Sequence, residues 1–231
     1  MAPKNLSFKI ILGSSSMARR KILADMGYDF TVMTADIDEK SIRKENAEEL
    51  VVALAEAKAD AIMSRLETTD HLEENTHPTL LITADTIFLA ISYLHLLVSR
   101  WRCTKELLEK SRQVRKKRAN SSKGLSETTS LPAQGKGYSG GQATVVGSVV
   151  VTNLTKGIRK GAWERSEVYF HEIPDEVIDS LIEEGIILNV AGGLMLEHPL
   201  TLPFVDTVIG TADHVMGLPR SLTEKLIQEA L

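Results

Sequence analysis

The chain has 231 residues, of which 43% are hydrophobic and 25% charged, and a formal net charge of −4, a balance typical of a soluble globular protein. Its length fits one large α/β domain or two small ones, and its longest apolar stretch, Ile87 to Val98, is too short to span a bilayer. A single cysteine, Cys103, excludes an internal disulfide and a cysteine-built zinc site. Because no secretory signal is recognisable either, we expect a cytoplasmic protein.

An apolar strand over 8–12 is followed by a glycine, three serines and a predicted helix. Ser14, Ser15 and Ser16 can cap this helix, because a serine oxygen accepts hydrogen bonds from the exposed amides of the first turn. The same amides and the positive helix end attract anions, and Arg19 and Arg20 add charged donors suited to phosphate. The pattern fits either an ordinary capped helix with two solvated arginines or a phosphate-binding turn.

A cluster of carboxylates, Asp36, Asp38 and Glu39, follows a short strand predicted over 29–33. Carboxylates at the end of a strand can hold a hard divalent cation, which prefers oxygen ligands. They can equally form a polar loop, and the spacing does not decide between the two.

A long helix is predicted over 46–66, because apolar residues recur along it at helical spacing. Lys58 lies beside this apolar stripe, where a lysine commonly packs its stem against the core and extends its ammonium to water. After a polar loop, the buried strand over 80–83 ends in Ala84-Asp85-Thr86. Because open α/β folds place their chemistry at the carboxyl ends of strands, Asp85 is a candidate site residue.

The segment over 87–136 has no clear element pattern, which is unusual inside a compact domain. Residues 100–123 carry ten Lys or Arg and two Glu, so this stretch is near +8 and the rest of the chain near −12. Such a block can contact nucleic acid or be a solvated, disordered insertion, and we favour the insertion. The amino-acid sequence of this segment also fits translation of an exon in the wrong reading frame, after mis-splicing. A literal G-x-G-x-x-G at Gly135 to Gly140 lacks the preceding strand of a dinucleotide site.

Regular elements are predicted again from residue 137 onward. The β-branched run over 144–154 indicates a buried or central strand, and a turn leads to a returning strand over 162–172. The alternation of Trp163, Val168 and Phe170 predicts one covered face for this second strand. Helices over 174–184 and from Ser221 complete the predicted elements.

The order of these motifs resembles the Maf family of nucleoside triphosphate pyrophosphatases. The resemblance is carried by the pattern Ser14-x-Ser16-x-x-Arg19, the intact Ala84-Asp85-Thr86, the glycine turn after residue 137, the stretch Ala191 to Pro199 and the closing Met216-Gly217-Leu218-Pro219. It covers residues 8–86 and 137–231. A Lys-Pro pair that the family presents between these parts is missing from this sequence.

The resemblance implies an α/β fold with a curved mixed β-sheet, flanking helices and two lobes around a central cleft, similar to inosine triphosphate pyrophosphatases. On this basis residues 1–231 form a single Maf-like domain, with 87–136 as its atypical part. A homodimer is a further expectation of the resemblance.

The implied activity is hydrolysis of a nucleoside triphosphate between its α and β phosphates, which yields the monophosphate and pyrophosphate. Asp85 would be the general base that activates water, and Glu39 and Asp85 would bind a divalent cation, magnesium or manganese. Asp36 and Asp38 stay ambiguous. The phosphates would be held by Ser14, Ser16, Arg19, Arg20 and Lys58. Because the Lys-Pro pair is missing, we expect impaired activity.

Three positions that set base specificity in the family correspond to Ala18, Thr86 and Glu197. Thr86 fits members acting on thymidine and uridine triphosphates, Glu197 fits members acting on 7-methylguanosine triphosphate, and Ala18 matches neither well. We expect a pyrimidine triphosphate as substrate, with 7-methyl-GTP or another modified nucleotide as the alternative. The competing hypothesis is a non-catalytic Maf-like protein that binds nucleic acid through residues 100–123, although nucleic acid is not the expected partner.

Overall fold

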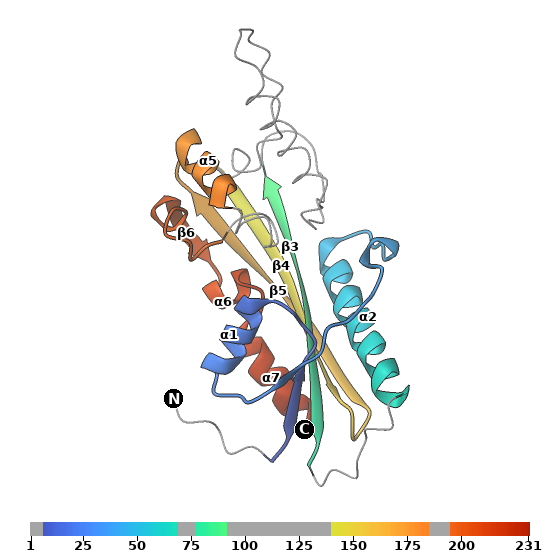
Figure 1. The fold of residues 1–231 in the computed structure, drawn as a ribbon. Coiled ribbons are helices and arrows are strands. Elements are labelled where there is room, and N and C mark those ends of the chain that lie inside the picture. Colours follow the sequence, from blue (N-terminus) through green and yellow to red (C-terminus); the bar gives the residue numbers. More distant parts are fainter. Residues whose placement is uncertain (1–6, 69–76, 92–139, 185–194) are drawn as a thin grey trace, which may run out of the picture. The chain divides into compact units, whose positions relative to one another are not determined.

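The computed structural model describes residues 7–68, 77–91, 140–184 and 195–231 (Figure 1). Its strands are β1 (Lys9–Leu12), β2 (Thr31–Val32), β3 (Thr79–Ile91), β4 (Gln142–Asn153), β5 (Ile158–Phe170) and β6 (Val205–Ile209). Its α-helices are α1 (Met17–Asp25), α2 (Ala47–Thr68), α5 (Asp175–Glu184), α6 (Ala212–Val215) and α7 (Arg220–Ala230), with short 3-10 helices η1 (Glu39–Ser41) and η4 (Leu202–Phe204).

The strands form one six-stranded sheet in the order β2-β1-β3-β4-β5-β6. β1 pairs in parallel with β2 and with β3, so Ile11 lies opposite both Thr31 and Leu81. β4 and β5 are joined by a tight turn in which the Gly157 amide donates to the Asn153 carbonyl at 2.9 Å, and the φ of +69° at this glycine explains its place there. The expected α/β class with a mixed sheet and flanking helices is therefore confirmed.

The chain divides into two compact units. The first comprises residues Met1–Ile87, Thr144–Glu167 and Val208–Leu231, and the second comprises Phe88–Ala143 and Val168–Thr207. The first unit contains α1, α2, α6 and α7, and the second contains α5. The cleft expected between two lobes, and the single domain over 1–231, stay predictions.

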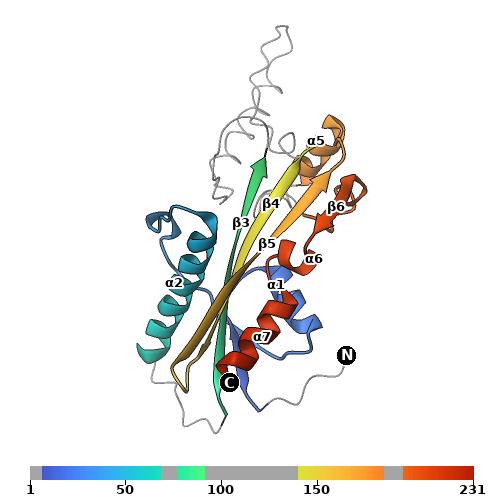
Figure 2. The same cartoon turned by 180° about the vertical axis from the view of Figure 1, so that it is seen from behind.

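In the first unit, hydrophobic side chains of β3 pack on both faces of the sheet. Leu80 and Ile82 join a buried cluster with residues of β1, β4, α1 and α7, whereas Leu81 packs against Ala59 and Ile62 of α2. Figures 1 and 2 show the same arrangement, with α2 on one side of these strands and α1 and α7 on the other. Because side chains alternate along a strand, consecutive residues of β3 point to different helices.

Two expectations about strands are wrong. The strand that contains Ala84-Asp85-Thr86 does not end there, because β3 continues to Ile91 with Ile87 and Phe88 buried. The first residues of the atypical segment are therefore regular strand. Trp163 is 47% exposed while Val168 and Phe170 are buried. Val168 lies five positions after Trp163, and an odd step along a strand turns two side chains to opposite faces.

Other predictions concern residues outside the described part of the chain. These include the basic stretch 100–123, Cys103, most of the G-x-G-x-x-G run and the glycines before Met195, and the interpretations placed on them stay predictions. Within the described ranges, no helix is both long and apolar enough to cross a membrane.

Candidate active site

The turn between β1 and α1 brings its polar groups against β3. The Gly13 amide donates to the Ile82 carbonyl at 2.7 Å and so extends the parallel pairing by one residue. A Cβ on Gly13 would lie 2.5 Å from Cγ2 of Thr83 and 2.8 Å from Cδ1 of Ile62. The close approach of the turn to β3 and α2 therefore requires glycine at this position.

The serines of this turn act as the sequence predicts for a helix cap. Ser16 is the N-cap of α1, and its Oγ accepts from the Arg19 amide at 3.4 Å. Ser14 is buried, and its Oγ accepts from the Ser16 amide at 3.2 Å and from Nη1 of Arg19 at 3.4 Å. Both hydroxyls therefore lie at the positive end of α1, where an anion is favoured.

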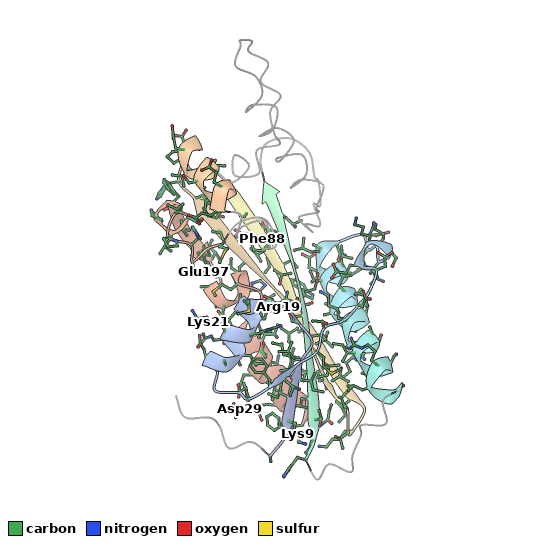
Figure 3. The ribbon with its side chains drawn as sticks, in the orientation of Figure 1. Lys9, Arg19, Lys21, Asp29, Phe88 and Glu197 are labelled. Carbon is green, nitrogen blue, oxygen red and sulfur yellow. The ribbon has the colours of Figure 1, made fainter. Side chains whose placement is uncertain are left out.

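Arg19 is built into the protein rather than solvated, and it lies where α1 meets the strands (Figure 3). Its Nε donates to the Gly217 carbonyl at 2.8 Å, Nη1 donates to the Ala84 carbonyl at 2.8 Å as well as to Ser14, and Nη2 donates to Oγ1 of Thr86 at 3.1 Å. These contacts use four of the five guanidinium N–H groups. Burial lowers the pKa of Arg19, while the charges of Asp85 and Glu39 act to raise it.

Lys58 joins the two acidic residues predicted as metal ligands. Its Nζ forms an ion pair and hydrogen bond with Oδ1 of Asp85, lies 3.4 Å from Oε1 of Glu39, and reaches the Ala84 carbonyl at 3.4 Å. The side chains of Lys58 and Asp85 are each 13% exposed and that of Glu39 is 27% exposed. We call Glu39, Lys58 and Asp85 the acidic cluster.

Two buried hydroxyls hold α2 against the sheet, and that of Thr83 explains why Lys58 contacts Asp85. Oγ1 of Thr83 donates to the Ala55 carbonyl of α2 at 2.8 Å, and Oγ of Ser148 donates to the Val51 carbonyl at 2.7 Å. Residues three apart share one face of a helix, and residues two apart share one face of a strand. The contact between Thr83 and Ala55 therefore places Asp85, one step along β3, beside Lys58, one turn along α2.

The strand β3 separates two kinds of polar environment. Asp85 faces α2 and contacts Lys58, whereas Thr86 contacts Arg19 of α1, which covers the other face. The Ala84 carbonyl accepts from both Arg19 and Lys58. One short stretch of β3 thus holds a carboxylate, a hydroxyl and two cations within direct hydrogen-bonding contact.

The remaining predicted site residues make fewer side-chain contacts with the rest of the site. Arg20 has a buried Nε with no hydrogen-bond partner among the described residues. Ala18 is half-buried on α1. Asp38 caps η1 by accepting from the Lys40 amide at 3.1 Å, and Asp36 is exposed. Only Glu39 of the three predicted carboxylates contacts Lys58 through an ion pair within the described ranges.

Glu197 belongs to the second unit, where it is exposed (Figure 3). The next residue, His198, is buried and anchors this stretch through Nε2, which lies 2.8 Å from Oε2 of Glu184. Nδ1 of His198 accepts from the Leu200 amide at 3.2 Å. The predicted specificity role of Glu197, like that of Ala18, stays a prediction.

A buried histidine close to Thr86 was not anticipated from the sequence. His214 of α6 is fully buried, and its Nδ1 lies 2.6 Å from Oγ of Ser166 on β5. A Cβ on Gly147 would lie 2.7 Å from Nε2 of His214 and 3.6 Å from Oγ1 of Thr86. The signal in the sequence is the closing motif Met216-Gly217-Leu218-Pro219, which begins two positions after this histidine.

The acidic cluster provides a partial set of ligands for a divalent cation. The described residues contain no group of three or more His, Cys, Asp or Glu able to hold a metal ion. Glu39 and Asp85 nevertheless both approach the single ammonium of Lys58, so their oxygens converge on one positive centre. Mg²⁺ is commonly held by one or two carboxylates together with substrate phosphates and water, and these two carboxylates fit that pattern.

Comparison with known proteins gives consistent relationships over nearly the whole chain. The Maf-like protein family matches residues 9–230. A 7-methyl-GTP pyrophosphatase from Dictyostelium discoideum is 30% identical, with 95% of this chain and 96% of that protein covered. A nucleoside triphosphate pyrophosphatase from Salinispora tropica is 26% identical (97% and 85% covered), and a dTTP/UTP pyrophosphatase from Vibrio vulnificus is 24% identical (96% and 98% covered). The chain therefore belongs to the Maf-like protein family.

Proposed function

We propose that this protein hydrolyses a nucleoside triphosphate to the monophosphate and pyrophosphate. The observation that carries the proposal is that Arg19 and Lys58 both contact the stretch Ala84–Thr86, which contains Asp85. This stretch lies beside the amides of the first turn of α1. A carboxylate next to two cations at a helix N-terminus suits water activation against a polyanionic substrate. Family membership and the printed names of the relatives support the same reaction class.

In this reaction Asp85 takes a proton from water. The resulting hydroxide attacks the phosphoanhydride, the bond between the α and β phosphates breaks, and pyrophosphate leaves. The side chain of Asp85 is only 13% exposed, so its proton acceptor oxygen is held in a fixed place beside Lys58. Positioned general bases of this kind typically contribute about a hundred- to ten-thousandfold to a rate.

A divalent cation, Mg²⁺ or Mn²⁺, would be held by Glu39 and Asp85. It would neutralise charge on the phosphate oxygens as the bond breaks. Lys58 would then contact the phosphates with the donors that it directs at these two carboxylates in the structure.

The triphosphate would otherwise be held by the start of α1. Ser14, Ser16 and Arg20 present hydroxyl and guanidinium donors there, and Arg19 contributes its charge and its remaining Nη2 N–H. Arg19 also fixes the Ser14 hydroxyl and the Thr86 hydroxyl. Its role is therefore both to attract phosphate and to hold the surrounding groups in place.

Two classes of nucleoside triphosphate are candidate substrates. The resemblance to family members acting on thymidine and uridine triphosphates makes Thr86 favour a pyrimidine triphosphate, and the dTTP/UTP pyrophosphatase relative supports that choice. The relative at 30% identity is a 7-methyl-GTP pyrophosphatase, and Glu197 is an exposed carboxylate that suits a positively charged methylated base. We place 7-methyl-GTP beside dTTP and UTP as a candidate of equal standing. The cytoplasmic location and homodimer stay predictions.

The direct test is product analysis with a panel of nucleoside triphosphates in Mg²⁺ or Mn²⁺. We expect pyrophosphate and the monophosphate from one member of the panel, and loss of release when the metal is chelated. Release of inorganic phosphate and a diphosphate would contradict the proposal. If no nucleotide is cleaved while residues 100–123 confer salt-dependent nucleic-acid binding, the non-catalytic hypothesis takes its place.

A further inference from the structure

His214, which was not predicted as a site residue, is a buried polar side chain with one unpaired ring nitrogen among the described residues. Its side chain is fully buried, Nδ1 lies 2.6 Å from Oγ of Ser166, and Nε2 has no hydrogen-bond partner within the described ranges. A buried polar atom without a partner costs free energy. Packing alone does not require a polar ring at this position, so the imidazole calls for an explanation beyond packing.

Three glycines clear the space around His214, Ser166 and Arg19, one beside each side chain. A Cβ on Gly147 would lie 2.7 Å from Nε2 of His214, and a Cβ on Gly210 would lie 2.1 Å from Oγ of Ser166. A Cβ on Gly217 would lie 3.2 Å from Nε of Arg19. Gly210 and Gly217 also have φ values of +117° and +105°, which side chains disfavour. The backbone is therefore shaped around the polar groups of His214, Ser166 and Arg19.

A short path of contacts connects His214 to Arg19. The Gly217 amide donates to the His214 carbonyl at 2.9 Å, and the Gly217 carbonyl accepts from Nε of Arg19 at 2.8 Å. On the other side of the guanidinium, Nη2 of Arg19 donates to Thr86, and Oγ1 of Thr86 lies 3.3 Å from the position of a Cβ on Gly217. Movement of His214 would thus shift the acceptor that orients Arg19.

We propose that His214 is a positioning residue of the phosphate site, which through Ser166 and the Gly217 peptide fixes the orientation of the Arg19 guanidinium. We call Arg19, Thr86, Ser166, His214 and Gly217 the buried network. The inference rests on the proposed function, because it takes Arg19 as a group that receives the triphosphate. His214 itself touches neither the substrate nor the acidic cluster in this scheme.

The charges around His214 fit this role. Burial lowers its pKa to about 4, although the neighbouring Asp213 acts to raise it. Burial also acts to raise the pKa of Asp213, but hydrogen bonds, chiefly from the Arg220 amide at 2.6 Å, hold it below its usual value, and Glu164 carries a pKa raised by burial and by Asp213. A neutral imidazole adds no repulsion to the cation of Arg19 at neutral pH.

The test compares His214→Leu, His214→Asn and Ser166→Ala with His171→Asn, which alters an exposed histidine on the second unit. Two readouts are used: KM and kcat for the best substrate, and calorimetric binding of inorganic triphosphate. We expect His214→Leu and Ser166→Ala to raise KM and weaken triphosphate binding about tenfold while kcat stays within about threefold. Asn can place an amide where Nδ1 lies, so His214→Asn should stay closer to the wild type.

A double-mutant cycle with Arg19→Gln identifies the route of the effect. Because His214 acts through Arg19, His214→Leu should cause no further loss of triphosphate binding in the Arg19→Gln background. Additive losses, or unchanged binding in a folded Ser166→Ala protein, would overturn the inference. If His214→Leu does not fold, Ser166→Ala and His214→Asn carry the same comparison. Failure of the proposed function would instead be seen in the wild type, as absence of pyrophosphate release.

Discussion

The two faces of β3 hold polar groups of opposite character. On the α2 face, the acidic cluster contains partly exposed side chains, and two of the contacts of Lys58 Nζ are 3.4 Å long. On the α1 face, the buried network contains two hydrogen bonds of 2.8 Å or shorter to Arg19 or His214 and a fully buried imidazole. The 3.4 Å contacts of Lys58 with Glu39 and the Ala84 carbonyl are weak enough to exchange partners, whereas a buried network of shorter hydrogen bonds holds one arrangement.

This difference suggests a division of labour within one strand. The acidic cluster can pass its contacts from protein groups to phosphate, metal and water, as a chemical step requires. The buried network presents Arg19 and Thr86 in a fixed geometry, as substrate positioning requires. The Ala84 carbonyl, which accepts from both cations, links the two.

The largest expected effect is that of Asp85→Asn. We expect kcat to fall about a hundred- to ten-thousandfold, because the variant lacks the general base. The control is Asp60→Asn on α2, where the carboxylate is 64% exposed and pairs with Arg159 at 2.7 Å. The activity of this variant should stay within about twofold of wild type. Steady-state kinetics decide the point, and an Asp85→Asn protein with more than about a tenth of the wild-type kcat would exclude Asp85 as the base.

The next largest effect is that of Lys58→Gln. Loss of a charge-assisted contact to phosphate costs about 1.5–3 kcal/mol, so kcat/KM should fall about ten- to a hundredfold. Lys21→Gln is the control, since Lys21 is an exposed lysine of α1. Equal kinetics for Lys58→Gln and wild type would mean that Lys58 only balances the charge of Asp85.

Gly147→Ala tests how tightly the buried network is packed. The added methyl group would lie 2.7 Å from Nε2 of His214, so we expect the free energy of unfolding to fall by about 1–3 kcal/mol. Gly161→Ala on β5 is the control, because its methyl group would lie 3.1 Å from Cγ2 of Val150 and 3.7 Å from the Val149 carbonyl oxygen, which is a milder approach. Urea unfolding measures both, and equal stability of the two variants would argue against close packing around His214.

The pH dependence of stability should report His214. Its pKa is about 4 in the folded protein against 6.5 as the ordinary value, so the unfolded chain binds its proton first. His214 makes its full contribution to the free energy of unfolding above pH 6.5, and this contribution is lost as the pH falls towards 4. Between pH 7 and 5.5 the free energy of unfolding should fall by about 1 kcal/mol from this group. Urea unfolding of wild type and His214→Asn at several pH values should differ by this slope, and parallel curves would contradict it.

The smallest effect is expected for Asp36→Asn. Asp36 is exposed, and the acidic cluster does not include it, so activity and metal dependence should stay within about twofold of wild type. A large increase in the Mn²⁺ concentration needed for half-maximal rate would show instead that Asp36 belongs to the metal site.

The sequence predicted the elements that carry the site well, because strong local signals define them. The serine cap of α1, the apolar stripe of α2 and the apolar run of β3 each follow from short-range patterns. The extension of β3 beyond Thr86 could not be predicted, since the segment after it lacks a turn signal that marks a boundary. Trp163 lies on the exposed face of β5 because it is an odd number of positions from Val168 and Phe170, which are buried.

The pairing of site residues depended on contacts far apart in the sequence. Lys58 meets Asp85 because Thr83 binds α2, and Arg19 meets Gly217 across 198 positions. Local pattern contains no information on such contacts. His214 was missed for the same reason, as its partners Ser166 and Gly147 come from other strands.

The most direct test of the division of labour compares Asp85→Asn with Thr86→Val on the best substrate and its non-hydrolysable α,β-methylene analogue. We predict that Asp85→Asn, at a Mg²⁺ concentration that saturates the remaining ligand Glu39, binds the analogue with an affinity near that of wild type and turns over almost no substrate. Thr86→Val, which removes the acceptor of Arg19 Nη2, should bind the analogue about tenfold more weakly and keep most of its kcat. If both variants lose the same parameter to the same extent, the two faces of β3 do not have separate roles.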